Sequence, residues 1–100
     1  MSSFDKLQTQ LKEGNVLQGT AIIEKQPKEH LYIDCSATLI KKEADSLTLT
    51  TEFSTKDTNL ILPTEITIHT SNVMEHENTF RIVYYNKNVL ILFVVSNLYY

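Results

Sequence analysis

The segment from Leu31 to Ile40 alternates apolar and polar residues without interruption. Because successive side chains of a β-strand point to opposite faces, this segment predicts a strand with one buried face and one face in water. The apolar set is Leu31, Ile33, Cys35, Ala37 and Leu39, and the polar set is Tyr32, Asp34, Ser36 and Thr38. A strand of this kind needs neighbours, so the chain is predicted to fold around a sheet.

Several further segments have the length and composition of strands. Turn residues separate them, including Pro27, which has no N–H, and the Asn86–Asn88 tripeptide. The stretch from Val89 to Val95 is apolar on both faces, which predicts a strand that is central or covered on both sides. The predicted strands span residues 16–25, 31–40, 47–53, 60–69, 79–85 and 89–97.

The N-terminal segment has a different period. Phe4, Leu7 and Leu11 lie at helical spacing, Ser2 or Ser3 can cap the first turn, and Gly14 follows as a stop signal. These features predict a helix over residues 3–12. A helix this short is not stable alone in water, so it must pack on the sheet or on a barrel mouth.

The fold class predicted from these elements is mainly β (α+β). Residues 1–100 form a single domain, in which the short helix packs on a six-stranded antiparallel barrel or sandwich. An apolar fraction of 42% is sufficient for a packed core. The polar stretch from Ser71 to Asn78 is predicted to be the main flexible loop.

Charge and composition argue against several classes of partner. The net charge is −3 and Arg81 is the only arginine, whereas nucleic-acid binders usually carry a basic face. The longest apolar run is far below the ~20 residues of a membrane span. The N-terminus lacks a signal-peptide core, and the lone Cys35 permits no internal disulfide. We therefore expect a cytoplasmic protein, of a cell or of the host of a virus, that binds neither nucleic acid nor membrane.

The residues that could carry chemistry do not form a recognisable catalytic or metal-binding pattern. His69 and His76, with Glu75 and Glu77, match the spacing of no closed metal site. Cys35 shares the apolar face of its strand, which predicts a small buried hydrophobe with a raised pKa. The chain has no G-x-S-x-G motif and no phosphate-binding glycine loop. We expect no enzymatic activity, no metal and no cofactor.

One segment resembles a known family. Asp34-Cys35-Ser36, followed by a turn and the segment 47–53, resembles the D-x-S-x-x-G region of PilZ barrels, and a helix before a bent meander is similar to Sm-like barrels. The PilZ resemblance implies a barrel of about six antiparallel strands. It does not extend to cyclic-dinucleotide binding, because Leu39 stands where the glycine would fall and no R-x-x-x-R precedes it.

Two functions remain open from the sequence. The first is a homodimeric protein-interaction module, an adaptor or inhibitor, with the apolar end Leu98, Tyr99 and Tyr100 in the interface and an edge strand near Pro63. The second is a sensor or sponge for a nucleotide-like or polar metabolite, bound at a PilZ-like or Sm-like barrel mouth. The candidate binding residues are Tyr32, Asp34, Ser36, Lys41, Lys42 and Arg81.

Overall fold

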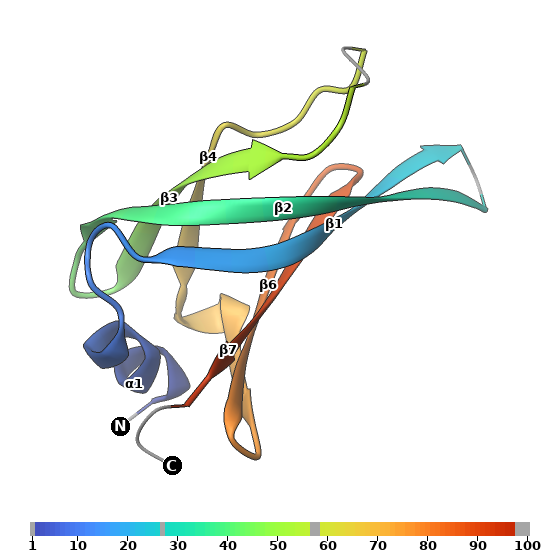
Figure 1. The fold of residues 1–100 in the computed structure, drawn as a ribbon. Helices are drawn as coiled ribbons and strands as arrows, with labels where there is room; N and C mark the ends of the chain where they lie inside the picture. The colour runs from blue at the N-terminus through green and yellow to red at the C-terminus, as the bar shows by residue number, and fades with distance from the viewer. Residues whose placement is uncertain (1, 27, 57–58, 98–100) are drawn as a thin grey trace.

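A computed structural model describes residues 2–26, 28–56 and 59–97, with the backbone alone at 25 and 26. Over these residues the chain forms one helix and a single seven-stranded antiparallel sheet in the order β4-β3-β2-β1-β7-β6-β5 (Figure 1). The elements are α1 (Ser3–Gln10), β1 (Val16–Gln26), β2 (Glu29–Lys42), β3 (Ser46–Phe53), β4 (Glu65–His69), the 3-10 turn η1 (Thr70–Asn72), β5 (Val73–His76), β6 (Thr79–Asn86) and β7 (Val89–Ser96).

The predicted fold class is confirmed, with a refinement in strand number. The sheet curls into a half-barrel, which is neither a closed barrel nor a sandwich (Figure 1). The helix ends at Gln10, two residues before its predicted end, and Leu11 is its C-cap. Ser2 is the N-cap, because its Oγ accepts a hydrogen bond from the Asp5 N–H at 3.1 Å.

The prediction of a flexible loop over residues 71–78 is wrong. This stretch contains the end of η1 and one strand more than the six predicted, β5. Strand β5 pairs with β6 from Val73↔Ile82 to His76↔Thr79. The turn between them has Glu77 at φ 54°. Only one side chain of this strand, Val73, enters the core, so its sequence shows almost no apolar periodicity.

The predicted strand over residues 60–69 is too long. Strand β4 begins at Glu65, and Pro63 in the preceding segment has no N–H to donate to a ladder. Leu60 and Leu62 still pack against the core from outside the sheet. The apolar composition of residues 60–62 therefore led to a predicted strand that is longer than the observed one.

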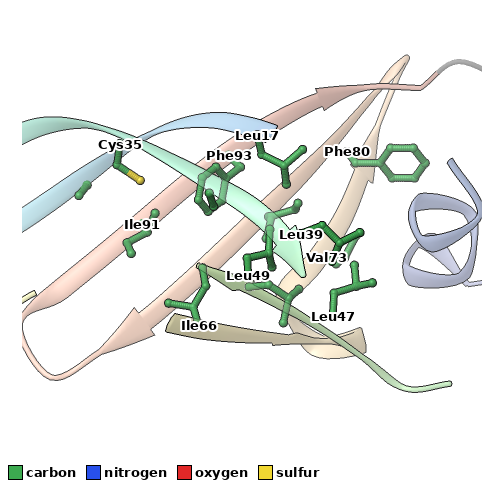
Figure 2. Close-up of a cluster of buried hydrophobic side chains, with 14 of the residues drawn as sticks. Leu17, Cys35, Leu39, Leu47, Leu49, Ile66, Val73, Phe80, Ile91 and Phe93 are labelled. Atoms are coloured by element: carbon green, nitrogen blue, oxygen red, sulfur yellow. The ribbon is translucent and has the colours of Figure 1, made fainter. Parts of the chain in front are cut away.

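The core fills the concave side of the curled sheet (Figure 2). Strand β2 confirms its predicted alternation, since Ile33, Cys35, Ala37 and Leu39 are all buried. The apolar residues of α1 and the residue after it complete the core at one end of the sheet: Phe4, Leu7 and Leu11.

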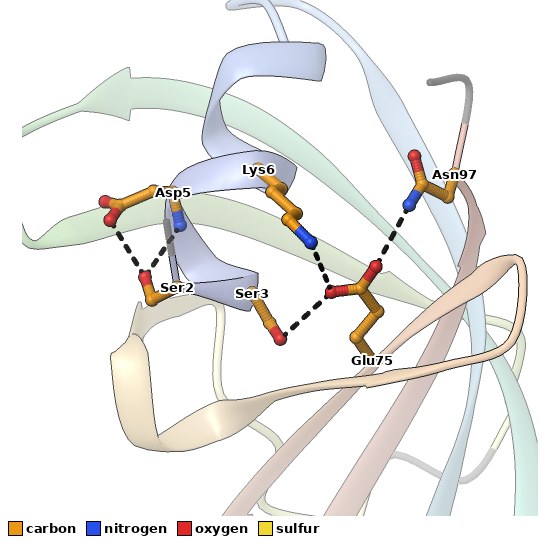
Figure 3. A network of polar contacts seen from close by, with 6 residues as sticks. All are labelled: Ser2, Ser3, Asp5, Lys6, Glu75 and Asn97. Carbon is orange, nitrogen blue, oxygen red and sulfur yellow. Dashed lines mark hydrogen bonds and ion pairs between the residues drawn. The ribbon is translucent and has the colours of Figure 1, made fainter. Parts of the chain in front are cut away.

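Polar contacts hold α1 against β5 (Figure 3). Lys6 Nζ lies 3.2 Å from Glu75 Oε1, and the Ser3 hydroxyl donates to the same oxygen at 3.4 Å. Asn97 Nδ2, just beyond β7, donates to Glu75 Oε2 at 3.2 Å. One carboxylate therefore links the helix, β5 and the end of β7.

Gly19 lies where β1 approaches β7 most closely. It pairs with Phe93, whose ring covers the position that a side chain would occupy. A Cβ at this residue would overlap the Leu92 carbonyl oxygen and lie 2.6 Å from Phe93 Cδ1. The absence of a side chain at Gly19 thus permits the Phe93 ring to lie over β1.

We predict that Gly19→Ala lowers the free energy of unfolding by roughly 2–3 kcal/mol, because the new methyl group overpacks a close contact. Gly14→Ala is the matched control. Its φ is +93° and no atom lies within 4 Å of the added Cβ, so it should cost only ~1 kcal/mol of backbone strain. Urea unfolding of both variants measures the difference, and a larger loss for Gly14→Ala would contradict the packing argument.

Candidate functional site

The convex side of β7 carries exposed apolar side chains. Val89, Ile91 and Phe93 point into the core, whereas Leu90 and Leu92 are half-buried and Val94 is 63% exposed. The prediction that this strand is central is confirmed, because it lies between β1 and β6. The alternative that it is covered on both sides is wrong, because among residues 2–26, 28–56 and 59–97 no second layer lies over the convex side of the sheet (Figure 1).

Neighbouring strands extend this apolar surface. In the sheet register Ile22 and Tyr85 flank Leu90 on either side, and Val83 lies opposite Leu92. We call this surface the outer apolar face. It consists of Ile22, Met74, Val83, Tyr85, Leu90, Leu92 and Val94. Tyr85 is 65% exposed and Met74 is 53% exposed. A contiguous apolar surface of this kind usually marks a contact with another molecule.

The other half of the convex side is polar. Ser36 pairs with Glu52 and Thr38 pairs with Thr50 across β2 and β3, as the alternation in the sequence predicts. Strand β4 continues this surface with Glu65, Thr67 and His69, which are all exposed. The apolar surface is therefore confined mainly to β1, β7, β6 and β5.

Two open hollows lie on the outer apolar face. One is lined in part by Met74, His76, Glu77, Arg81 and Val94. The other lies at the opposite end of the same strands and is lined by Ile22, Glu24, His30, Tyr85, Asn88 and Leu90. Both hollows are shallow depressions that are open to solvent.

The predicted binding residues lie in three separate places. Tyr32, Asp34 and Ser36 are on the convex side of β2, and Arg81 is on the convex side of β6. The two lysines lie instead at the far end of β2, which separates them from Tyr32 and Arg81. Lys41 Nζ is 3.3 Å from Glu43 Oε1, and Lys42 Nζ donates to the Leu11 carbonyl at 2.8 Å.

The predicted interface residues Leu98, Tyr99 and Tyr100 lie outside the described residues, and their role stays a prediction. The outer apolar face was not identified from the sequence. Its signal is the second apolar set of the 89–95 segment, which predicts a strand that is central or covered on both sides.

The histidines and carboxylates near β5 point in different directions. Glu75 faces α1, whereas His76 lies on the convex side with its Nε2 3.8 Å from Glu77 Oε1. In residues 2–26, 28–56 and 59–97 no three His, Cys, Asp or Glu side chains are placed to hold a metal ion. The same part of the chain contains no helix long and apolar enough to cross a membrane.

Cys35 lies on the inner face of β2, and its thiol is buried. Burial raises its pKa from the ordinary value of 9.0 to about 11. At neutral pH the thiol is therefore almost entirely protonated and lacks the thiolate that nucleophilic chemistry requires.

We compared the chain with known protein families, curated proteins and solved structures. No family model, curated protein or solved structure matches the chain. The argument for function therefore rests on the residues of this chain.

We predict that burial of Cys35 makes stability fall as the pH rises from about 9 to about 11. In this window the unfolded thiol has lost its proton while the folded thiol retains it, so the unfolded state binds fewer protons and is favoured. Urea unfolding at pH 7, 9 and 11 should show a larger loss for the wild type than for Cys35→Ala. Equal losses in both proteins would show that Cys35 contributes nothing to this dependence.

Proposed function

We propose that this protein is a non-enzymatic interaction module that forms a homodimer through its outer apolar face. The observation that carries the proposal is the run of half-buried and exposed apolar side chains on the convex side of β7, continued on β1, β6 and β5. Leu90 and Leu92 lie where β7 pairs with both β1 and β6. Val83, Tyr85 and Val94 have a paired strand on one side, and Met74 stands on the short edge strand β5.

The rigidity of this surface supports a binding role. Interior strands of a sheet already hold their backbone conformation, so association costs little backbone ordering at Ile22, Leu90 or Leu92. Removing apolar surface from water contributes roughly 25 cal/mol per Å². Burial of this apolar face on both copies can therefore supply the binding free energy that a stable dimer needs beyond the cost of association.

The state of the candidate reactive side chains favours binding over catalysis. Burial keeps the Cys35 thiol protonated, and Glu75 is engaged by α1. The small-ligand alternative has less support, because the lysines and Arg81 do not line one hollow. As the sequence suggests, we place the module in the cytoplasm, where its single free thiol needs no oxidising environment.

We predict that Leu92→Lys weakens the dimer at least tenfold, because it places a charge at the centre of the outer apolar face, and the same charge from the second copy adds repulsion. Thr50→Lys is the matched control. It adds the same side chain at an exposed convex position of β3, outside the face. Sedimentation equilibrium of the wild type and both variants over a range of concentrations measures the effect.

Val94→Lys provides a second variant at a position that is already 63% exposed, so it should not disturb folding. Circular dichroism and urea unfolding check that each variant is folded. A wild type that is monomeric at high concentration, or a Thr50→Lys variant that dissociates as readily as Leu92→Lys, would overturn the proposed function.

A further inference from the structure

The side chain of Asn72, at the end of η1, joins two strands that do not pair with each other. Its Oδ1 accepts a hydrogen bond from the His69 N–H of β4 at 2.8 Å, and its Nδ2 donates to the Val83 carbonyl of β6 at 2.9 Å. A peptide group in a strand between β4 and β6 would make the same two bonds, accepting on one side and donating on the other. The amide of Asn72 therefore stands where an intervening strand would begin.

The outer edge of β4 continues beyond this bridge with unpaired backbone groups. The Thr51 N–H donates to the Thr64 carbonyl at 3.0 Å, just before β4 begins. Because alternate residues of an antiparallel strand bond to the same neighbour, Ile66 and Ile68 bond to β3. The N–H and C=O of Thr67 point to the other side, where no residue of the described ranges pairs with them.

Strand β6 has a matching open edge at Tyr85. The Asn97 N–H donates to the Asn78 carbonyl at 2.7 Å, so in this register the even-numbered residues of β6 bond to β7. The N–H and C=O of Tyr85 therefore point away from β7. Pairing with β5 reaches only Ile82, which leaves these two groups without a backbone partner in the part of the chain that the structure describes.

The two open edges lie at the same level between the strands, because Thr67 and Tyr85 are each two residues beyond the bond with Asn72. The Cα atoms of β4 and β6 approach within 8 Å, which is less than the ~9.6 Å that a strand between them needs. The two strands separate with distance from η1 (Figure 1). An open hollow of about 240 Å³, lined by residues 61–63 and 86–89, lies at the far end.

We infer that the gap between β4 and β6 binds an extended segment of another protein, which adds to the sheet as one strand. Its backbone bonds to Thr67 on one side and to Tyr85 on the other, as in other cases of strand addition to a sheet edge. Its inward side chains cover Leu62 and Tyr84, which are half-buried against the core. This partner segment therefore carries apolar residues at alternate positions.

The surroundings of the gap favour a single strand over a folded copy of this chain. Strand β6 lies beside the outer edge of β4, so a second sheet cannot pair with that edge without displacing β6. Glu65 on β4 and Lys87 after β6 are both exposed at the open end, and their charges are opposite. The outward side chains of the partner segment are therefore polar and uncharged. This site lies beyond the proposed dimer contact, because it uses strand edges and not the outer apolar face.

A peptide with the sequence of residues 46–53 is the probe, because the same sequence already pairs with β4 as β3. In the free protein we expect the amide hydrogens of Thr67 and Tyr85 to exchange rapidly with solvent. With about 1 mM peptide, both should exchange at least tenfold more slowly. Hydrogen exchange followed by NMR measures these rates. A peptide that only replaced β3 would leave the Thr67 amide exposed.

Two controls remove the hydrogen bonds and keep the side chains. The same peptide with N-methyl groups at the positions of Thr48 and Thr50 cannot donate from the edge that faces β4, so it should slow neither amide. In the protein, Thr67→Pro removes the outward N–H and should abolish binding, whereas Thr67→Val keeps it and should bind as the wild type does. Circular dichroism checks that both variants are folded, and the methylated peptide tests the inference without any variant.

The outcomes separate this inference from the proposed function. Unchanged exchange, slower exchange at only one of the two amides, or equal slowing by the methylated peptide overturns it. Protection of Thr67 that grows with the concentration of the protein alone assigns the edge to a second copy and also overturns it. Leu92→Lys should bind the peptide as the wild type does, so loss of the dimer leaves this inference standing, and failure of the peptide leaves the proposed dimer standing.

Discussion

The pairing of β1 with β7 is the interaction on which the rest of the structure depends. Strands β1 to β4 form one meander and β5 to β7 form another, and the five residue pairs between Gly19–Ile23 and Val89–Phe93 join them into one sheet. This long-range pairing places Phe93 over Gly19 and closes the concave core around Ala21 and Ile91. It also places Ile22 beside Leu90, and so creates the centre of the outer apolar face.

The position of α1 explains why one side of the sheet remains uncovered. Its apolar residues and the Glu75 contacts hold it at the end of the half-barrel, beside β5 (Figure 3). The helix therefore protects the core, but it does not reach the convex side of β7. In the function that we propose, a second copy of the same surface covers the apolar residues on this side of the sheet.

Much of the fold could be predicted from the sequence, whereas less of the candidate site could be. The alternation of β2 is visible because one of its faces is buried and the other is solvated, and the spacing of Phe4, Leu7 and Leu11 shows the helix. Strand β5 was not predicted because it is held by pairing with β6 and by contacts of Glu75 with α1. These contacts are long-range and leave no periodic pattern in the local sequence. Tyr32, Asp34 and Arg81 were selected as binding residues, but their relation to one apolar surface depends on strand order.

The sequence by itself determined which residues form the core of each element and where most strands begin and end, because periodicity records which side of a strand meets water. Only the tertiary structure decided that Leu90 and Leu92 are half-buried and Val94 is exposed on the convex side, beside Ile22 and Val83. The physical reason is that an apolar face looks the same in a sequence whether a second layer of the same chain covers it or not. Burial on the second face depends on how far the sheet curls and on where α1 packs.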